Sequence, residues 1–203
     1  MRLAPKILSC FILLSLSSFG WPQKDKPAYQ YWKETDTETL WRGKYANCDY
    51  RYYVTLPAGF VGHGTHAPSP NHGFLVALPN AEKTQNTSSE DTRFIWVDAE
   101  YDFLDFKSLR EAADYEWALL SLHKSGARQI LQESVRLDKS VAIRTLGAYD
   151  SPTSKVLEEE VIVLRGGILY AIGLKTTYEN QTDDRKKYNQ LLSGFHFWRI
   201  HNC

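Results

Sequence analysis

Two apolar, β-branched runs in the C-terminal half carry the most regular hydrophobic pattern of the chain. They cover residues 157–164 and 168–176, and Arg165, Gly166 and Gly167 separate them. Adjacent glycines can adopt the positive φ angles that a tight hairpin turn requires. The two runs are therefore predicted to pair as an antiparallel hairpin, against which the rest of the domain packs.

A helical pattern follows this hairpin directly. Thr182 is a suitable N-cap, and Tyr188, Leu191 and Leu192 fall on one helical face. Gly194 is the predicted stop. Because a hairpin with one apolar face needs a cover, we expect this helix to pack on it.

Shorter patterns upstream predict five further strands and one more helix. The strand patterns cover residues 48–56, 74–78, 92–101, 129–137 and 141–149. Ser108 and Glu111 form a capping box for the helix, which should stop near Ser125 and Gly126. Residues 59–73 and 81–91 are predicted loops.

This element order predicts a single α+β domain at residues 47–203, preceded by an extended arm at residues 21–46. The mostly short connections favour antiparallel neighbours over right-handed crossovers. We expect a mainly antiparallel sheet of about six to seven strands, flanked by helices as an α/β/α sandwich.

Three sequence features of this layout together indicate a resemblance to a known group of proteins. Residues 53–60 (Tyr-Val-Thr-Leu-Pro-Ala-Gly-Phe) open the domain, Gly166 and Gly167 turn the hairpin, and the closing helix runs into residues 193–195 (Ser-Gly-Phe). In these features the chain resembles the PsbP-like group of small exported domains, over roughly residues 47–198. The resemblance implies a binding or accessory role without catalysis, and it assigns no functional residues.

The first 20 residues have the three parts of a secretory signal. Arg2 and Lys6 precede an apolar run, and Ser18 and Gly20 suit cleavage before Trp21. The run is too short to span a bilayer, and no later segment reaches the roughly 20 apolar residues required. The chain is therefore predicted to be secreted or periplasmic, with no membrane span.

The net charge of the chain limits the classes of partner that it is expected to bind. Without the signal, 22 basic residues stand against 24 acidic ones, a formal net charge of −2. Such a chain has no overall field that attracts nucleic acid or anionic lipid.

Two cysteines, Cys48 and Cys203, remain after removal of the signal, and an even pair in an oxidising compartment favours a disulfide. The alternatives are two thiols too far apart to join, and pairing between chains.

The loop at residues 59–73 contains His63, His66 and His72. Convergent imidazoles can bind zinc or copper, whereas the plainer interpretation is an exposed loop of turn residues. Residues 62–66 (Gly-His-Gly-Thr-His) also resemble the motif around the catalytic histidine of subtilisin-type proteases. The aspartate and the nucleophilic serine of that triad are missing, so a protease is not predicted. No cofactor is predicted either.

Two groups of carboxylates lie on predicted strands. Asp98, Glu100 and Asp102 alternate along a strand, which indicates one solvated sheet face or, if buried, acid–base chemistry. An enzyme would need distant groups such as His66 and Asp98 to meet in a pocket. Residues 158–160 are three glutamates that point to alternate faces and so cannot converge, and one of them should pair with a cross-strand lysine.

These observations support an exported, monomeric, non-enzymatic binding or accessory protein of the cell envelope, whose partner is an envelope protein or a small ligand. The dense tyrosines around Tyr50 and Tyr52 and the three loop histidines are the candidate contacts. One alternative is a secreted hydrolase or metal-binding protein that uses His63, His66 and His72. Another is an inhibitor or immunity-type protein of a secreted factor.

Overall fold

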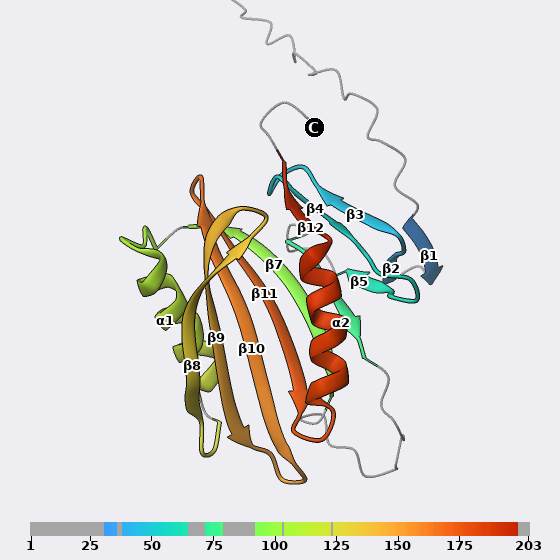
Figure 1. Cartoon of the computed structure of the whole chain (residues 1–203). Helices are drawn as coiled ribbons and strands as arrows, with labels where there is room; N and C mark the ends of the chain where they lie inside the picture. Colours follow the sequence, from blue (N-terminus) through green and yellow to red (C-terminus); the bar gives the residue numbers. More distant parts are fainter. Residues whose placement is uncertain are drawn as a thin grey trace, which may run out of the picture.

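The computed structural model describes residues 31–35, 38–64, 72–78, 92–102, 104–122 and 124–198, with side chains from Leu40 onward. Within these residues the chain forms two β-sheets and two helices (Figure 1). The strands are β1 (Tyr31–Thr35), β2 (Glu38–Trp41), β3 (Lys44–Asn47), β4 (Tyr52–Thr55), β5 (Gly62–Gly64), β6 (Phe74–Ala77), β7 (Phe94–Tyr101), β8 (Arg128–Leu137), β9 (Ser140–Asp150), β10 (Lys155–Arg165), β11 (Ile168–Thr177) and β12 (Phe195–Phe197).

The larger sheet has nine strands in the order β1-β2-β5-β6-β7-β11-β10-β9-β8, and the smaller has three in the order β12-β4-β3. Every strand pair is antiparallel. The α+β class and the antiparallel sheet are thus confirmed, but the predicted number of six to seven strands is too low. Strands such as β5 and β12 have only three residues, too few to show a period.

Two hairpins on one side of the larger sheet form as their turn residues require. Gly166 and Gly167 have φ of 61° and 73° and join β10 to β11, as predicted. Asp138 and Lys139 have φ of 43° and 70° and join β8 to β9. Two successive positive φ angles match the right-handed twist of the flanking strands. Both turns lie at the same end of the sheet, because β8 to β11 are consecutive antiparallel neighbours.

Helices α1 (Leu109–Ser121) and α2 (Gln181–Ser193) begin and end close to the predicted positions. The Ser108 hydroxyl accepts a hydrogen bond from the Glu111 N–H at 3.1 Å, which confirms Ser108 as the N-cap, while the Glu111 carboxylate accepts from the Lys107 N–H at 2.7 Å and not from Ser108. Helix α1 stops earlier than predicted. Helix α2 stops at Gly194 as predicted. Its N-cap is Asn180 and not Thr182, because the Asn180 carbonyl already accepts from the Asp184 N–H at 3.1 Å.

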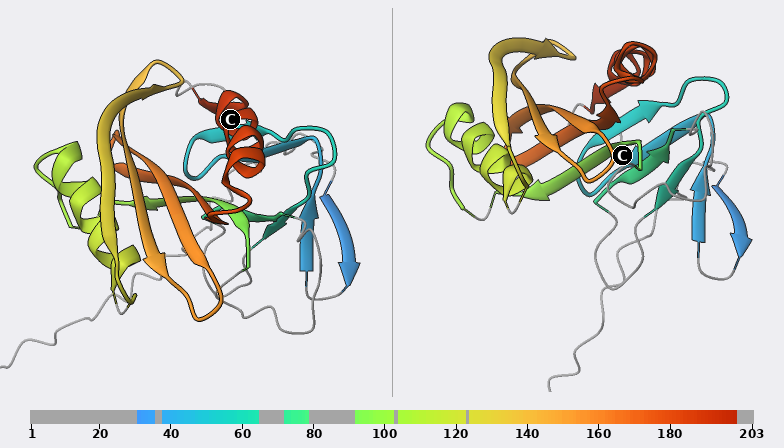
Figure 2. Two further views of the ribbon diagram at one scale, coloured as in Figure 1. Left: turned by 60° about the horizontal axis from the view of Figure 1, so that its bottom comes forward. Right: turned by 90° about the horizontal axis from the view of Figure 1, so that it is seen from below.

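The two helices cover opposite faces of the larger sheet. Ile162 of β10 packs with Ala112 of α1 in one apolar cluster, whereas its neighbour Val161 belongs to the cluster that contains Tyr188 and Leu191 of α2. Successive strand side chains point to opposite faces, so adjacent residues serve the two helices. The sheet curls strongly at β8, and α2 lies inside this curve while α1 lies outside it (Figure 2).

The smaller sheet closes one end of the α2 face. Phe195 of β12 stacks on Tyr52 of β4, with ring centroids 5.2 Å apart. The Tyr170 hydroxyl on β11 donates to the Tyr50 carbonyl at 2.7 Å, which ties the two sheets together. None of the helices in the described ranges is long and apolar enough to cross a membrane.

Candidate ligand-binding groove

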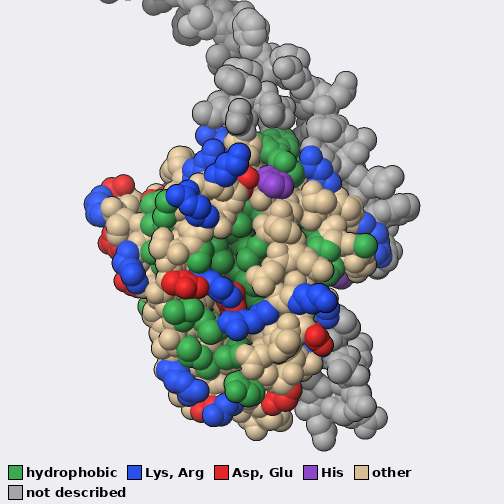
Figure 3. Space-filling model, in the orientation of Figure 1, with side chains coloured by type: hydrophobic (Ala, Val, Ile, Leu, Met, Phe, Trp, Pro, Cys, Tyr) green, Lys and Arg blue, Asp and Glu red, His purple; other side chains and the backbone are tan. Residues whose placement is uncertain are grey.

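An open groove lies between α2 and the curled β8–β9 hairpin. Its volume is about 310 Å³, at the small end of the range of about 300–1,000 Å³ typical of small-molecule sites. Apolar side chains line much of it, namely Val135, Leu137, Val161, Leu192 and Phe195. Figure 3 shows apolar side chains gathered between α2 and the hairpin on this face. The groove exists because α2 packs on β11 and leaves the α2-side surface of the β8–β9 hairpin uncovered.

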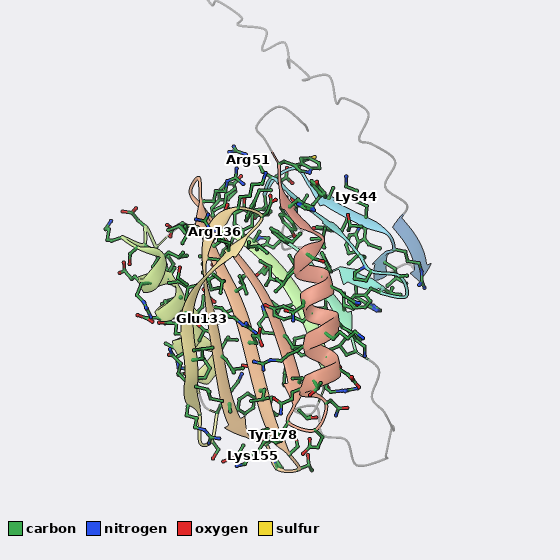
Figure 4. The ribbon with its side chains drawn as sticks, viewed as in Figure 1. Lys44, Arg51, Glu133, Arg136, Lys155 and Tyr178 are labelled. Atoms are coloured by element: carbon green, nitrogen blue, oxygen red, sulfur yellow. The ribbon has the colours of Figure 1, made fainter. Side chains whose placement is uncertain are left out.

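A network of four charged side chains borders the groove toward the middle of the sheet. The carboxylate of Glu159, only 2% exposed, lies between Arg144 at 2.5 Å and Arg185 at 2.7 Å. Arg144 also approaches Glu133 of β8 at 3.6 Å. Two guanidinium groups thus balance two carboxylates, so this wall of the groove carries no net charge. Figure 4 labels Glu133 on the curled strand.

At its other end the groove continues into a polar basin of about 370 Å³. The two cavities share Asp138 and His196. One Asp138 oxygen lies 3.1 Å from His196 Nδ1, and the other accepts the Phe197 N–H at 2.8 Å. Both oxygens of the carboxylate are therefore engaged, and they fix β12 to the tip of the β8–β9 hairpin.

The basin is rich in cations. Lys139 and Arg165 line it, and Arg136 lines the adjoining groove. None of the three has an ion pair within the described residues: Arg136 donates to the Lys139 carbonyl at 3.1 Å, and the Arg165 guanidinium lies 4.8 Å from the ring centroid of Phe197. Arg51 lies near this end as well, and basic side chains gather above the apolar surface (Figures 3 and 4).

These cations also act on a buried tyrosine below the basin. Burial raises the pKa of Tyr170 to about 12, and the positive charges of Arg165 and Arg51 oppose that rise. A positive field at this end of the molecule stabilises negative charge in general. The groove therefore combines an apolar half with a cationic half.

No protein-family model matches the amino-acid sequence, and a search of the curated proteins finds no match. Solved structures do match. Cyanobacterial PsbP from Synechocystis sp. PCC 6803 aligns with a TM-score of 0.53 at 15% identity, over 78% of this chain and 92% of that protein. The chain has a PsbP-like fold. LpqN of Mycobacterium tuberculosis, described as involved in cell envelope biogenesis, aligns with a TM-score of 0.52 at 11% identity, over 73% of this chain and 83% of LpqN.

His63 and His72, two of the predicted contact residues, do not line the groove or the basin. His63 lies on β5 opposite Leu40 and Leu75, and His72 Nδ1 lies 3.8 Å from an Asp98 oxygen. His66 lies outside the described residues. No group of three metal-ligating side chains occurs among the residues that the structure describes. The three-histidine site therefore stays a prediction.

The predicted tyrosine contacts lie in the core of this fold. Tyr50 is 3% exposed and Tyr52 is 0% exposed. The Tyr50 ring lies 5.0 Å from the His72 ring, and the Tyr52 hydroxyl donates to the His72 carbonyl at 2.9 Å. Both tyrosines thus hold the start of β6 in place. Their role in contacting a ligand stays a prediction.

Cys48 lies in the turn between β3 and β4. Cys203 lies outside the described residues, so the disulfide between the two cysteines stays a prediction. The intact mass of the mature, unreduced protein would test it, because a disulfide makes the chain about 2 Da lighter than the dithiol.

The three consecutive glutamates of β10 are all buried, which the sequence did not indicate. As predicted, they do not converge. Glu159 meets Arg144 and Arg185 on the α2 face, whereas Glu158 pairs with Lys124 at 2.7 Å on the other face. The lysine partner lies between α1 and β8 and not on a neighbouring strand.

Carboxylates gather on the α1 face. Burial and then the charge of Glu116 raise the pKa of Glu160 well above its ordinary value. Burial and the charges of Glu100 and Asp98 raise the pKa of Glu116 to about 7. The predicted solvated face at Asp98 and Glu100 agrees with the exposure of both side chains. Of these carboxylates only Glu160 is buried, and all of them lie on the face opposite to the groove.

Sequence reasoning missed the cations of the basin. Lys139 and Arg165 each stand in the turn region of a hairpin, where charge ordinarily indicates nothing more than a solvated turn. A usable signal was nevertheless present. Turns separated by two antiparallel strands emerge at the same end of a sheet, so basic residues in both turns fall close together.

Proposed function

We propose that this protein is an exported, non-enzymatic binding protein of the cell envelope, and that the groove between α2 and the β8–β9 hairpin is its binding site. One observation carries the proposal. The groove is an open, partly apolar concavity on the α2 face of the larger sheet, and the rest of that face forms the core. A surface that buries apolar atoms at one end and exposes them at the other is typical of a binding site.

Three further observations support this proposal. The N-terminal pattern of a secretory signal favours export. Two proteins with the same fold are PsbP and an LpqN described as involved in cell envelope biogenesis. Within the described residues, His196 hydrogen-bonds only to Asp138, whose carboxylate also holds β12. This histidine therefore serves to close the fold, and no hydroxyl nucleophile of the described chain is activated by it.

The experiment fills the groove and asks whether a natural ligand is lost. Asn189 lines the groove from α2, and the adjacent Gln190 is also exposed but does not line it. We expect small molecules extracted from the purified wild-type protein and from Gln190→Trp to include a species that is missing from Asn189→Trp. Identical extracts from all three proteins would overturn the assignment of the groove.

A further inference from the structure

We infer that the ligand of this groove is a single-chain anionic amphiphile, with its apolar chain between α2 and the β8–β9 hairpin and its anionic head group in the cationic basin. This inference rests on the proposed function and adds the chemical class of the ligand. It follows from the arrangement of two chemically different cavities that share Asp138 and His196.

The apolar half selects a hydrocarbon chain. Val135 comes from β8, Leu192 from α2 and Phe195 from β12, so apolar atoms line the groove from three elements. The network of Glu133, Arg144, Glu159 and Arg185 borders this half, and its charges are internally balanced. Such a wall offers no net charge to a second ionic group, so it favours an uncharged chain end there.

The cationic half selects a negative head group. Arg136, Lys139 and Arg165 have no ion pair within the described residues, and the basin's carboxylate, Asp138, already has both oxygens engaged. A guanidinium group and an ammonium group are the side chains best suited to carboxylate and phosphate. This cluster stands in a chain whose mature form has a net negative charge, so it departs from the average of the sequence.

The two halves have the order that an amphiphile requires. Asp138 and His196 stand at the junction, and the basin lies at the outer end of the hairpins. A chain laid in the groove would carry its head group directly into the reach of Lys139 and Arg165. A peptide with several polar side chains would instead place polar groups against Val135 and Leu192, where burial without partners is costly.

The test compares four probes on the full mature protein by isothermal titration calorimetry, each below its micelle concentration. Dodecanoate and dodecyl phosphate carry a negative head, dodecyl glucoside has the same chain with a neutral head, and inorganic phosphate has no chain. We expect both anionic amphiphiles to bind at least about tenfold more tightly than the glucoside, with affinity that falls as salt is added. Inorganic phosphate should bind at least about tenfold more weakly than dodecyl phosphate.

Two matched pairs of variants locate the binding. Arg165 and Lys155 are the two ends of β10, and only Arg165 lines the basin. Lys139→Asn combined with Arg165→Gln should weaken dodecanoate at least about tenfold and leave the glucoside unchanged. Asparagine suits the positive φ at position 139. Lys155→Gln should leave both probes unchanged. Asn189→Trp should abolish binding of every amphiphile, and Gln190→Trp should not.

Each result that differs from these expectations would overturn a specific part of the inference. The claim of an anionic head group would be overturned if dodecyl glucoside bound as tightly as dodecanoate. It would also be overturned if the double variant bound dodecanoate as tightly as the wild type does. In both cases the groove would remain the binding site. Phosphate that binds as tightly as dodecyl phosphate would overturn the apolar chain. If the wild type bound none of the amphiphiles, the inference about the ligand class would be overturned. The comparison of extracts with Asn189→Trp tests separately whether the groove is a binding site. The thermal transition of each variant verifies that it is folded.

Discussion

Strand β10 carries three buried glutamates, and two of them, Glu159 on the α2 face and Glu160 on the α1 face, are stabilised in opposite ways. On the α2 face, Glu159 lies between two guanidinium groups. On the same face Asp184 accepts hydrogen bonds from Arg93 at 3.1 Å and from Thr176 at 2.6 Å. Buried carboxylates of this face thus have cationic partners.

On the α1 face Glu158 pairs with Lys124 at 2.7 Å, whereas burial favours the protonated form of Glu160. Burial and then the charge of Glu116 raise the pKa of Glu160 well above its ordinary value, whereas burial and the charges of Glu100 and Asp98 raise the pKa of Glu116 to about 7. The indole of Trp96 hydrogen-bonds to Glu160, but within the described residues no arginine or lysine pairs with Glu160. The α2 face therefore holds charged, paired carboxylates, and the α1 face holds the Glu158–Lys124 pair together with two carboxylates of raised pKa, Glu116 and Glu160. Removing the charge of Arg93 on the α2 face or of Glu116 on the α1 face should have opposite effects on stability.

The largest effect is expected from the buried pair on the α2 face. Arg93→Met removes the main cation beside Asp184, whose side chain is 0% exposed. Breaking a buried pair from one side costs about 3–5 kcal/mol, since the remaining charge is left without its partner. Urea unfolding followed by tryptophan fluorescence measures the loss. The exposed Arg42, changed to Met, is the control, and equal loss in both variants would contradict this role of Arg93.

The second prediction concerns the packing of Trp96 against Gly173 on the α1 face. A methyl group at Gly173 would lie 1.9–2.2 Å from ring atoms of Trp96, so the glycine allows the indole to lie against β11. Gly173→Ala should lower the free energy of unfolding by about 1–3 kcal/mol. Combining it with Trp96→Val should cost less than the sum of the two single changes. Strict additivity in urea unfolding would show that the two residues do not interact.

The third change gives the opposite sign. Because the pKa of Glu116 is about 7 in the folded protein and 4.5 in its ordinary state, the folded state binds the proton more tightly. Stability should therefore fall as pH rises from about 4.5 to about 7. Glu116→Gln should raise stability at pH 8 by about 1 kcal/mol, a value reduced for solvent screening, and have little effect at pH 4. Thermal unfolding at both pH values checks this, and a variant less stable than wild type at pH 8 would contradict it.

The smallest effect is expected at the rim of the α2-face network. Glu133 is 43% exposed and lies 3.6 Å from Arg144, so Glu133→Gln should change stability by under about 1 kcal/mol. Urea unfolding beside Arg93→Met makes the contrast direct. A loss as large as that of Arg93→Met would mean that the whole network acts as one buried unit.

Local patterns were enough to predict the parts of the fold that local chemistry determines. The β10–β11 hairpin follows from alternating side chains and two turn glycines, and α1 follows from its Ser108 N-cap. Two α2 residues, Tyr188 and Leu191, were likewise placed on the core face by their spacing. Each of these features depends on residues only a few positions apart.

The site could not be predicted in this way, because its parts are distant in sequence. Glu159 meets Arg144 and Arg185 from a neighbouring strand and from α2. The groove depends on the curl of β8, which no single residue specifies. Histidines and tyrosines carry recognisable chemical groups, whereas the apolar residues that line the groove are mostly valines and leucines, which in a sequence indicate only a core.

The short strand β12 has a consequence for how this protein is made. It pairs Phe195 with Val54, residues about 140 positions apart, and its Phe197 N–H locks the β8–β9 turn. Closing so long a loop is slow and must wait for the last part of the chain to leave the ribosome. The small sheet therefore stays incomplete until residues 195–197 have been synthesised, and the domain reaches its final fold only after that point.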